Sequence, residues 1–288
     1  MLKRSLLMTL FALAYSNCAS AQDMTLKLGG FYSQSDSSMD VTNPSLGKNY
    51  TLDFESDLAL AEDQFLPFFE VNYQFNDRHH IYLDWKQLHR NSEIDGVVKP
   101  FQIEMDDVIY DIKAGGRLET TLNIDIARVG YGYDVFQGTD YSLGLSLGLH
   151  AMFIDTGFEG VIGACASAEL VNNVCGSTPI PRVVDESVTA PLPDIGVYAE
   201  YELLPGWQFT AHGQYFYVKL DDLKGSLVDV QIGVDANITA NWHMSVAYNY
   251  YKVDVDIAQT AGSSDVNIAD YNIYYSFVGP MLAISYTF

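Results

Sequence analysis

The stretch Tyr141–His150 reads YSLGLSLGLH, and it decides the fold. Every odd position from 141 to 149 carries Tyr or Leu, whereas the even positions carry Ser, Gly or His. Side chains of a β-strand point alternately to its two faces, so this pattern predicts a strand with one apolar face and one small or polar face. The same two-residue period recurs along the chain, and we expect an all-β fold.

The alternating segments predict about ten antiparallel strands in a single up-and-down transmembrane β-barrel. The polar face is rich in Gly, Ser, Asn, Gln and His, which suits a narrow, wet lumen better than the exposed face of a soluble β-sandwich. Aromatic residues at strand ends beside short turns fit the girdle of a membrane interface; they are Phe75, Tyr141, Trp207 and Trp242. The predicted strands are 23–35, 65–75, 80–91, 118–135, 141–157, 191–204, 207–221, 225–239, 242–257 and 267–288.

Connection lengths orient this barrel. Short turns alternate with long segments near 36–64, 91–117, 158–191 and 257–267, as expected for short periplasmic turns and long external loops. Twelve strands is the alternative, if Phe101–Lys113 forms two further half-strands instead of an external hairpin. The apolar phase of the last strand changes at Gly279-Pro280, and we expect a β-bulge there rather than a turn.

The first residues indicate export. Lys3 and Arg4 precede the apolar run Leu6–Tyr15, and Ala19-Ser20-Ala21 resembles a cleavage site, so residues 1–21 are predicted to be a signal peptide. The remainder, 22–288, is predicted to be one barrel domain. Cleavage removes two of the 15 basic residues and none of the 37 acidic ones, which changes the net charge from −22 to −24. Such an acidic protein has no general positive field for binding nucleic acid.

Two cysteines remain after cleavage. Cys165 and Cys175 lie in a segment rich in Gly, Ala, Ser, Asn and Pro, and an even pair in an oxidising compartment predicts one loop disulfide, with free thiols as the alternative. The spacing of His, Cys and acidic residues predicts no metal site, and no glycine-rich fingerprint predicts a cofactor.

The C-terminus carries the resemblance to a known class. Tyr286-Thr287-Phe288 ends a strand in which Leu282, Ile284 and Tyr286 alternate. This ending, together with the signal peptide and the strand pattern, resembles bacterial outer-membrane β-barrel proteins and their C-terminal assembly signal. The resemblance implies location in the outer membrane, contact with outer-membrane lipid, and insertion by the barrel-assembly machinery, with Tyr286 and Phe288 in the signal.

Acidic residues outnumber basic ones among the side chains predicted to face the lumen. A ring of carboxylates favours cations, so one hypothesis is a pathway for small polar or cationic solutes. The other is a closed barrel whose charges pair across a packed interior, because about ten strands leave a narrow lumen. The lumen candidates are Glu70, Asp84, Lys86, Arg128, Asp194, Glu200, His212, Asp229 and Asp235.

These features favour a porin-like or structural envelope protein without a cofactor. Two other classes stay open. One is a barrel enzyme acting on envelope lipids or peptides. The sequence offers candidates for it, none in a local arrangement that matches such enzymes: His79-His80, His89, Asp106-Asp107 and Asp221-Asp222. The other is a surface adhesion protein that binds through residues 160–189. A His within hydrogen-bond reach of an acid or Ser would favour the enzyme.

Overall fold

The computed structural model describes residues 23–43, 48–97, 100–105, 108–166, 178–220, 223–260 and 267–288. The predicted signal peptide lies outside these residues and stays a prediction. Short strands accompany the long ones. The strands are β1 (Met24–Asn43), β2 (Lys48–Asp53), β3 (Asp63–Asn76), β4 (His79–Ile94), β5 (Phe101–Met105), β6 (Val108–Ile112), β7 (Leu118–Gln137), β8 (Tyr141–Ala166), β9 (Ile180–Leu204), β10 (Trp207–Leu220), β11 (Leu223–Asn237), β12 (Trp242–Thr260) and β13 (Asn267–Thr287).

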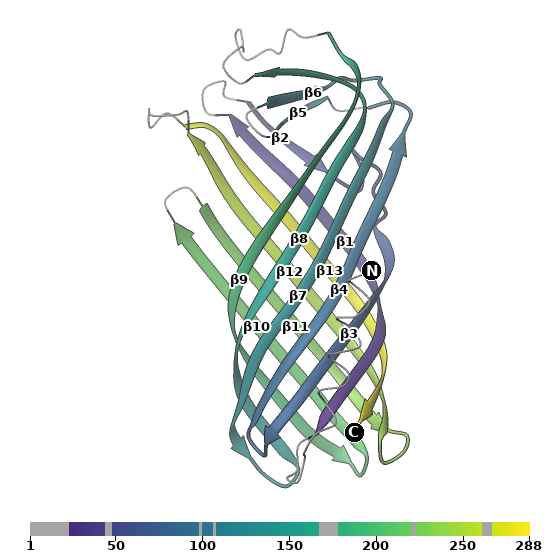
Figure 1. Ribbon diagram of the computed structural model, residues 1–288, viewed down its shortest axis with the longest axis vertical. Helices are drawn as coiled ribbons and strands as arrows, with labels where there is room; N and C mark the ends of the chain where they lie inside the picture. Colours follow the sequence, from purple (N-terminus) through teal and green to yellow (C-terminus); the bar gives the residue numbers. More distant parts are fainter. Residues whose placement is uncertain are drawn as a thin grey trace, which may run out of the picture.

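Antiparallel pairing closes the long strands into a barrel (Figure 1). Among the described residues the circuit has ten strands, in the order β1-β3-β4-β7-β8-β9-β10-β11-β12-β13, and β13 pairs with β1 to complete it. The prediction of ten strands is confirmed. Phe101–Ile112 forms the external hairpin β5–β6, which pairs with the outer end of β8 and adds no strand to the circuit. Short β2 pairs with β1 outside the circuit.

The outward face of the barrel carries an apolar belt. On β8 the odd residues from Tyr141 to Leu149 are between 39% and 63% exposed, and Phe153 is also exposed. From Tyr141 to Phe153 a strand tilted by about 40° rises about 30 Å, which matches the hydrocarbon thickness of a bilayer. The predicted girdle residues Phe75, Trp207 and Trp242 are exposed beside short turns. No helix in the described residues is long and apolar enough to cross a membrane.

The apolar residues change from the outward face to the inward face along several strands. On β12 the even residues from Trp242 to Tyr250 are exposed, whereas Tyr251 and Val253 are buried inside the barrel. On β7 Val129 and Tyr131 are exposed, and the even residues Leu122, Ile124 and Ile126 are buried. Lipid covers the outer face of the barrel only within the belt. Beyond it, the apolar side chains fill the lumen instead.

The same change explains β13 without a bulge. Tyr275 and Phe277 face the lumen and are buried, whereas Leu282 and Ile284 face outward. The register with β1 is the same before and after Gly279, and pairing with β12 continues through it, so the predicted bulge is wrong. Glycine is required there because a Cβ atom at 279 would lie 1.9 Å from the backbone oxygen of Tyr32.

The outer end of the barrel is a wall of extended strands. β8 continues to Ala166 and β9 starts at Ile180, so much of the predicted 158–191 loop is strand. Cys165 lies at the end of β8, but Cys175 is outside the described residues, and the disulfide stays a prediction. At the opposite end, the backbone N–H of Phe288 donates to Met24 O at 3.0 Å, close to the four short turns.

Candidate functional site in the barrel lumen

Arg128 organises a polar layer across the lumen. Its Nε donates to Oδ2 of Asp84, and its Nη1 donates to Oε1 of Gln214 at 2.7 Å. The guanidinium lies 4.7 Å from the ring centre of Tyr82, whose hydroxyl accepts from Nε2 of Gln214 at 2.9 Å. Arg128 and Asp84 are both buried. A buried charge needs a partner and hydrogen bonds, and here each of these polar groups supplies them to another.

Asp229 is the acceptor at the opposite side of the layer and is fully buried. Its Oδ1 accepts from Nδ2 of Asn249 at 2.7 Å. Its Oδ2 lies 3.5 Å from Lys86 Nζ, 3.9 Å from Arg128 Nη1 and 4.0 Å from His150 Nε2. The attraction of these basic groups compensates the burial of the carboxylate.

His150 links the layer to a third acid. Its Nδ1 lies 3.0 Å from Oδ2 of Asp194, and both side chains are buried. Three carboxylates therefore face Arg128, Lys86 and His150 inside the barrel. We name this set the ionic layer; it comprises Tyr82, Asp84, Lys86, Arg128, His150, Asp194, Gln214, Asp229 and Asn249.

The ionic layer spans the barrel rather than lining one wall. Lys86 belongs to β4 and Asp229 to β11, and these strands are five steps apart in either direction around the circuit. A contact of 3.5 Å between side chains from opposite strands means that side chains fill the lumen at this level. Three of the six acids that the sequence places in the lumen, Asp84, Asp194 and Asp229, contact basic side chains at this level.

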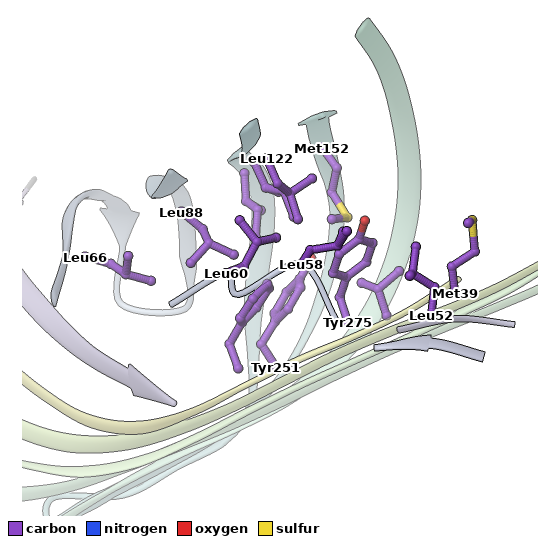
Figure 2. Close-up of a cluster of buried hydrophobic side chains, with 14 of the residues drawn as sticks. Met39, Leu52, Leu58, Leu60, Leu66, Leu88, Leu122, Met152, Tyr251 and Tyr275 are labelled. Atoms are coloured by element: carbon purple, nitrogen blue, oxygen red, sulfur yellow. The ribbon is translucent and has the colours of Figure 1, made fainter. Parts of the chain in front are cut away.

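A second closure lies toward the outer end. Residues 54–62, which we name the inner segment, follow β2 and fold into the barrel. Figure 2 shows Leu58 and Leu60 between Leu122 on one wall and Tyr251 and Tyr275 on the other. Leu58 and Leu60 are each only 2% exposed. Their burial among side chains from several strands makes this half of the lumen an apolar core.

A buried charged group fastens the inner segment. Glu55 accepts from Nη1 of Arg90, and its two oxygens also accept from the backbone N–H of Ser37 at 2.9 Å and the Ser37 hydroxyl at 2.6 Å. Arg90 Nη2 donates to Ser37 Oγ at 2.8 Å, and Arg90 is fully buried. Farther along, Ser92 Oγ donates to the backbone oxygen of Leu58 at 2.5 Å. Strands β1 and β4 thus hold the inner segment from two sides.

The remaining lumen candidates lie toward the end with the short turns. Asp235 is 3.9 Å from Lys27 Nζ, and Glu200 accepts from Gln208 Nε2 at 2.9 Å. Glu70 is opposite Lys27 in the β1–β3 register, and His212 is opposite Tyr198 in the β9–β10 register. Glu200 is exposed, so this end is open to solvent. We name it the vestibule, and Glu70, Glu200 and Asp235 bias it toward negative charge.

The structure therefore divides the nine predicted lumen residues. Five of them, Asp84, Lys86, Arg128, Asp194 and Asp229, meet in the ionic layer. Glu70 and His212 border this layer and interact with its charges, and Glu200 and Asp235 lie in the vestibule. Sequence reasoning missed the roles of Tyr82, Gln214 and Arg90. The alternation could have placed all three in the lumen. Each occupies an even position, and the predicted lumen residues on the same strand also occupy even positions.

Two His–acid pairs bear on the enzyme hypothesis. His89 Nε2 lies 3.2 Å from Oδ1 of Asp125 on the outside of the barrel, and Asp125 also accepts from Trp85 Nε1 at 3.3 Å. The second pair is the buried His150–Asp194. In the described residues, no hydrogen bond joins either His to a Ser, Thr or Cys side chain. The geometry supplies a potential base without a nucleophile in contact with it.

The closed antiparallel circuit, the apolar belt and the polar layer inside it define a transmembrane β-barrel of the outer-membrane class. The chain belongs to a family described as "Protein of unknown function, DUF481", which matches residues 121–266, just over half of the chain. No curated protein matches it in sequence.

Several solved barrels are similar in outline. The toluene transporter TodX of P. putida is 10% identical with a TM-score of 0.36, over 94% of this chain and 91% of that protein. Ail, the attachment invasion locus protein of Yersinia pestis, is 9% identical with a TM-score of 0.31, over 93% and 100%. The translocator domain of the autotransporter NalP from Neisseria meningitidis is 8% identical with a TM-score of 0.31, over 99% and 94%. At these low scores no function is transferred.

Proposed function

We propose that this protein is an outer-membrane barrel whose lumen is closed to polar solutes, and that it serves as a structural envelope protein. The signal peptide pattern, the apolar belt and the C-terminal aromatic residue support placement in the outer membrane. The observation that carries the proposal is the Lys86–Asp229 contact between opposite strands within the ionic layer. A barrel whose interior is a packed core resists unfolding and anchors its long outer wall in the bilayer.

The inner segment supports the same function. A polar solute that entered from the outer end would meet Leu58 and Leu60 before it reached the ionic layer. Passage along the axis would require rupture of the Arg90–Glu55 pair and of the paired charges below it. Breaking a buried ion pair costs about 3–5 kcal/mol, so constitutive diffusion is strongly disfavoured.

Planar-bilayer recordings test this function directly. We expect wild-type barrels, shown to be folded by heat-modifiable migration on a gel, to give no steady conductance. A variant with Lys86→Ser, Arg128→Ser and a Gly/Ser replacement of residues 55–61 removes both closures and should conduct. A steady cation-selective current through the wild type, reduced by Asp229→Asn or Asp235→Asn, would establish the porin-like function instead.

The vestibule supports a second candidate function, the binding of small cationic solutes from the periplasm. Glu70, Glu200 and Asp235 all interact electrostatically with Lys27, and Glu70 also interacts with Lys86 and Arg128 of the ionic layer. Calorimetric titration of the detergent-solubilised barrel with a small diamine is the test. Binding should fall at least tenfold in Glu200→Gln/Asp235→Asn and remain in Glu159→Gln, which alters an exposed acid of the outer wall. Equal affinity in all three proteins would exclude the vestibule as the binding site.

A further inference from the structure

Strand β9 loses one of its two neighbours in the outer half of the barrel. β9 pairs with β8 from Ile180 to Tyr201, but with β10 only from Ile195 onward. Both strands continue past the last pair, Ile195–Tyr215, without joining. Within the described residues no strand pairs with the β10-facing edge of 180–194. Figure 1 shows β9 continuing to the top of the molecule while β10 and β11 end lower. We name this divergence the lateral gap.

Two prolines remove N–H donors from the unpaired, β10-facing edge of β9. In an antiparallel strand, alternate N–H groups point to the same side, and the N–H of Glu202 donates to Asp140 on the β8 side. The N–H groups of odd residues therefore point toward β10. Pro191 and Pro193 occupy the odd positions just beyond Ile195 and have no N–H. The open edge thus lacks the donors that would be most costly to leave unpaired in lipid.

The lateral gap reaches the outer rim of the apolar belt. Pro193 is opposite Leu149 and Thr189 is opposite Phe153, and these two β8 residues are the outermost apolar side chains of its belt. Tyr215, at the start of the gap on β10, is 52% exposed on the outward face. The gap is therefore continuous with the membrane-facing surface and lies at the depth of the outer leaflet.

Behind the lateral gap lies the apolar half of the lumen. Leu192 on β9 and Leu227 on β11 face inward and are buried, and Phe216 on β10 is half-buried. Leu192, Leu227 and Phe216 belong to or pack against the same apolar core that the inner segment fills. An apolar chain that entered between β9 and β10 would exchange lipid contacts for contacts with these side chains. On the β9 side it would cover no N–H donor at positions 191 and 193.

We propose that the lateral gap receives an acyl chain of an outer-leaflet lipid and seats it against Leu192 and Phe216. This inference goes beyond axial closure, because the ionic layer blocks polar passage along the barrel and leaves lateral access untouched. Addition of a strand from another protein is the weaker alternative, since Pro191 and Pro193 remove two donors that such a strand would need.

Photolabelling in vesicles tests the proposal. Full-length folded protein is reconstituted with a phospholipid that carries a diazirine at the end of one acyl chain, and adducts are mapped by mass spectrometry after irradiation. We expect adducts on the inward-facing Leu192 and Phe216 in addition to outward residues such as Ile195 and Tyr215. Adducts confined to outward residues would overturn the proposal, whatever the conductance measurements show for the axis.

Variants that close the lateral gap, and a matched control, test whether the acyl chain enters between β9 and β10. Pro191→Val/Pro193→Val restores two donors and lets β9 pair with β10, and Leu192→Trp fills the gap without new pairing. We expect each to reduce inward adducts at least tenfold relative to outward adducts. Pro181→Val is the control, because β10 ends before it reaches that level and the gap stays open. Inward labelling that persists in both gap variants would exclude this route.

Discussion

The stability of the ionic layer depends on individual charged side chains, of which Arg128 is the central one. Arg128 is buried and contacts both Asp84 and Gln214. We expect Arg128→Met to leave Asp84 and Asp229 short of a counter-charge and to destabilise the barrel by about 3–5 kcal/mol. The measurement is the temperature at which the folded band on a gel converts to the unfolded band.

Two controls define the result for Arg128. Arg117→Met removes an exposed arginine whose ion-pair partners in the described part of the chain, Glu93 and Glu119, are half exposed, and it should leave the transition unchanged. The double variant Asp84→Asn/Arg128→Met should recover part of the loss, since it removes the uncompensated acid with its partner. A single Arg128→Met variant as stable as the wild type would contradict the structure of the layer.

Glu55 controls the inner segment at the same scale. Its carboxylate accepts three hydrogen bonds from Arg90 and Ser37, and Glu55→Gln keeps the shape but removes the charge. We expect faster proteolytic cleavage within residues 54–62 and a lower unfolding temperature, because the fully buried Arg90 loses its counter-charge. Glu62→Gln alters an exposed acid of the same segment and serves as the control. Equal cleavage rates would show that the ion pair does not hold the segment.

At the scale of the strand, the apolar belt has a defined outer limit. Leu147 lies within the belt on β8, whereas Val183 lies beyond it on β9, and both point outward with more than 60% of the side chain exposed. We expect Leu147→Arg to cost about 2–4 kcal/mol of folding free energy in a bilayer. Val183→Arg should be tolerated, because water surrounds that position.

Folding efficiency into lipid vesicles, measured by gel migration, separates these two variants. The two substitutions are chemically the same, so a difference between them reports only the surrounding medium. Equal loss in both would mean that the belt extends farther than Phe153, and equal tolerance would mean that β8 does not face lipid.

For the whole molecule, the sequence predicts a covalent closure at the outer end. Cys165 is the last residue but one of β8, and Cys175 precedes β9 in the sequence, so a disulfide would link two strands that already pair. We expect a linked Cys165–Cys175 peptide in a non-reducing digest. Closing a loop of this size stabilises by about 3 kcal/mol in the chain-entropy treatment, so reduction should lower the unfolding temperature without opening the barrel. Free thiols in the oxidised protein would contradict this prediction.

The strand pattern is a local property, which is why so much of the barrel could be predicted. Alternation in Tyr141–His150 and its counterparts sets which residues share a face, and short turns place neighbouring strands antiparallel. Ten strands and the external hairpin Phe101–Ile112 follow from these signals. The phase change at Gly279 was misread as a bulge, because an apolar residue looks the same in sequence whether it faces lipid or a packed lumen.

The partners within the lumen are a non-local property that only the closed barrel decides. Parity places Lys86 and Asp229 inside, but their contact depends on closure of ten strands and on the stagger accumulated around the circuit. The contact of Arg90 with Glu55 depends on the closed barrel in the same way. The divergence of β9 from β10 at the lateral gap also has no signal in the residue alternation, because both strands keep their two-residue period. The alternation of residues alone therefore predicts the strands, the face to which each side chain points, and the class of membrane barrel. Whether the acid-biased interior is an open ring or a paired core is settled by distances across the barrel, because Coulomb attraction and packing act between atoms that the chain itself does not place side by side.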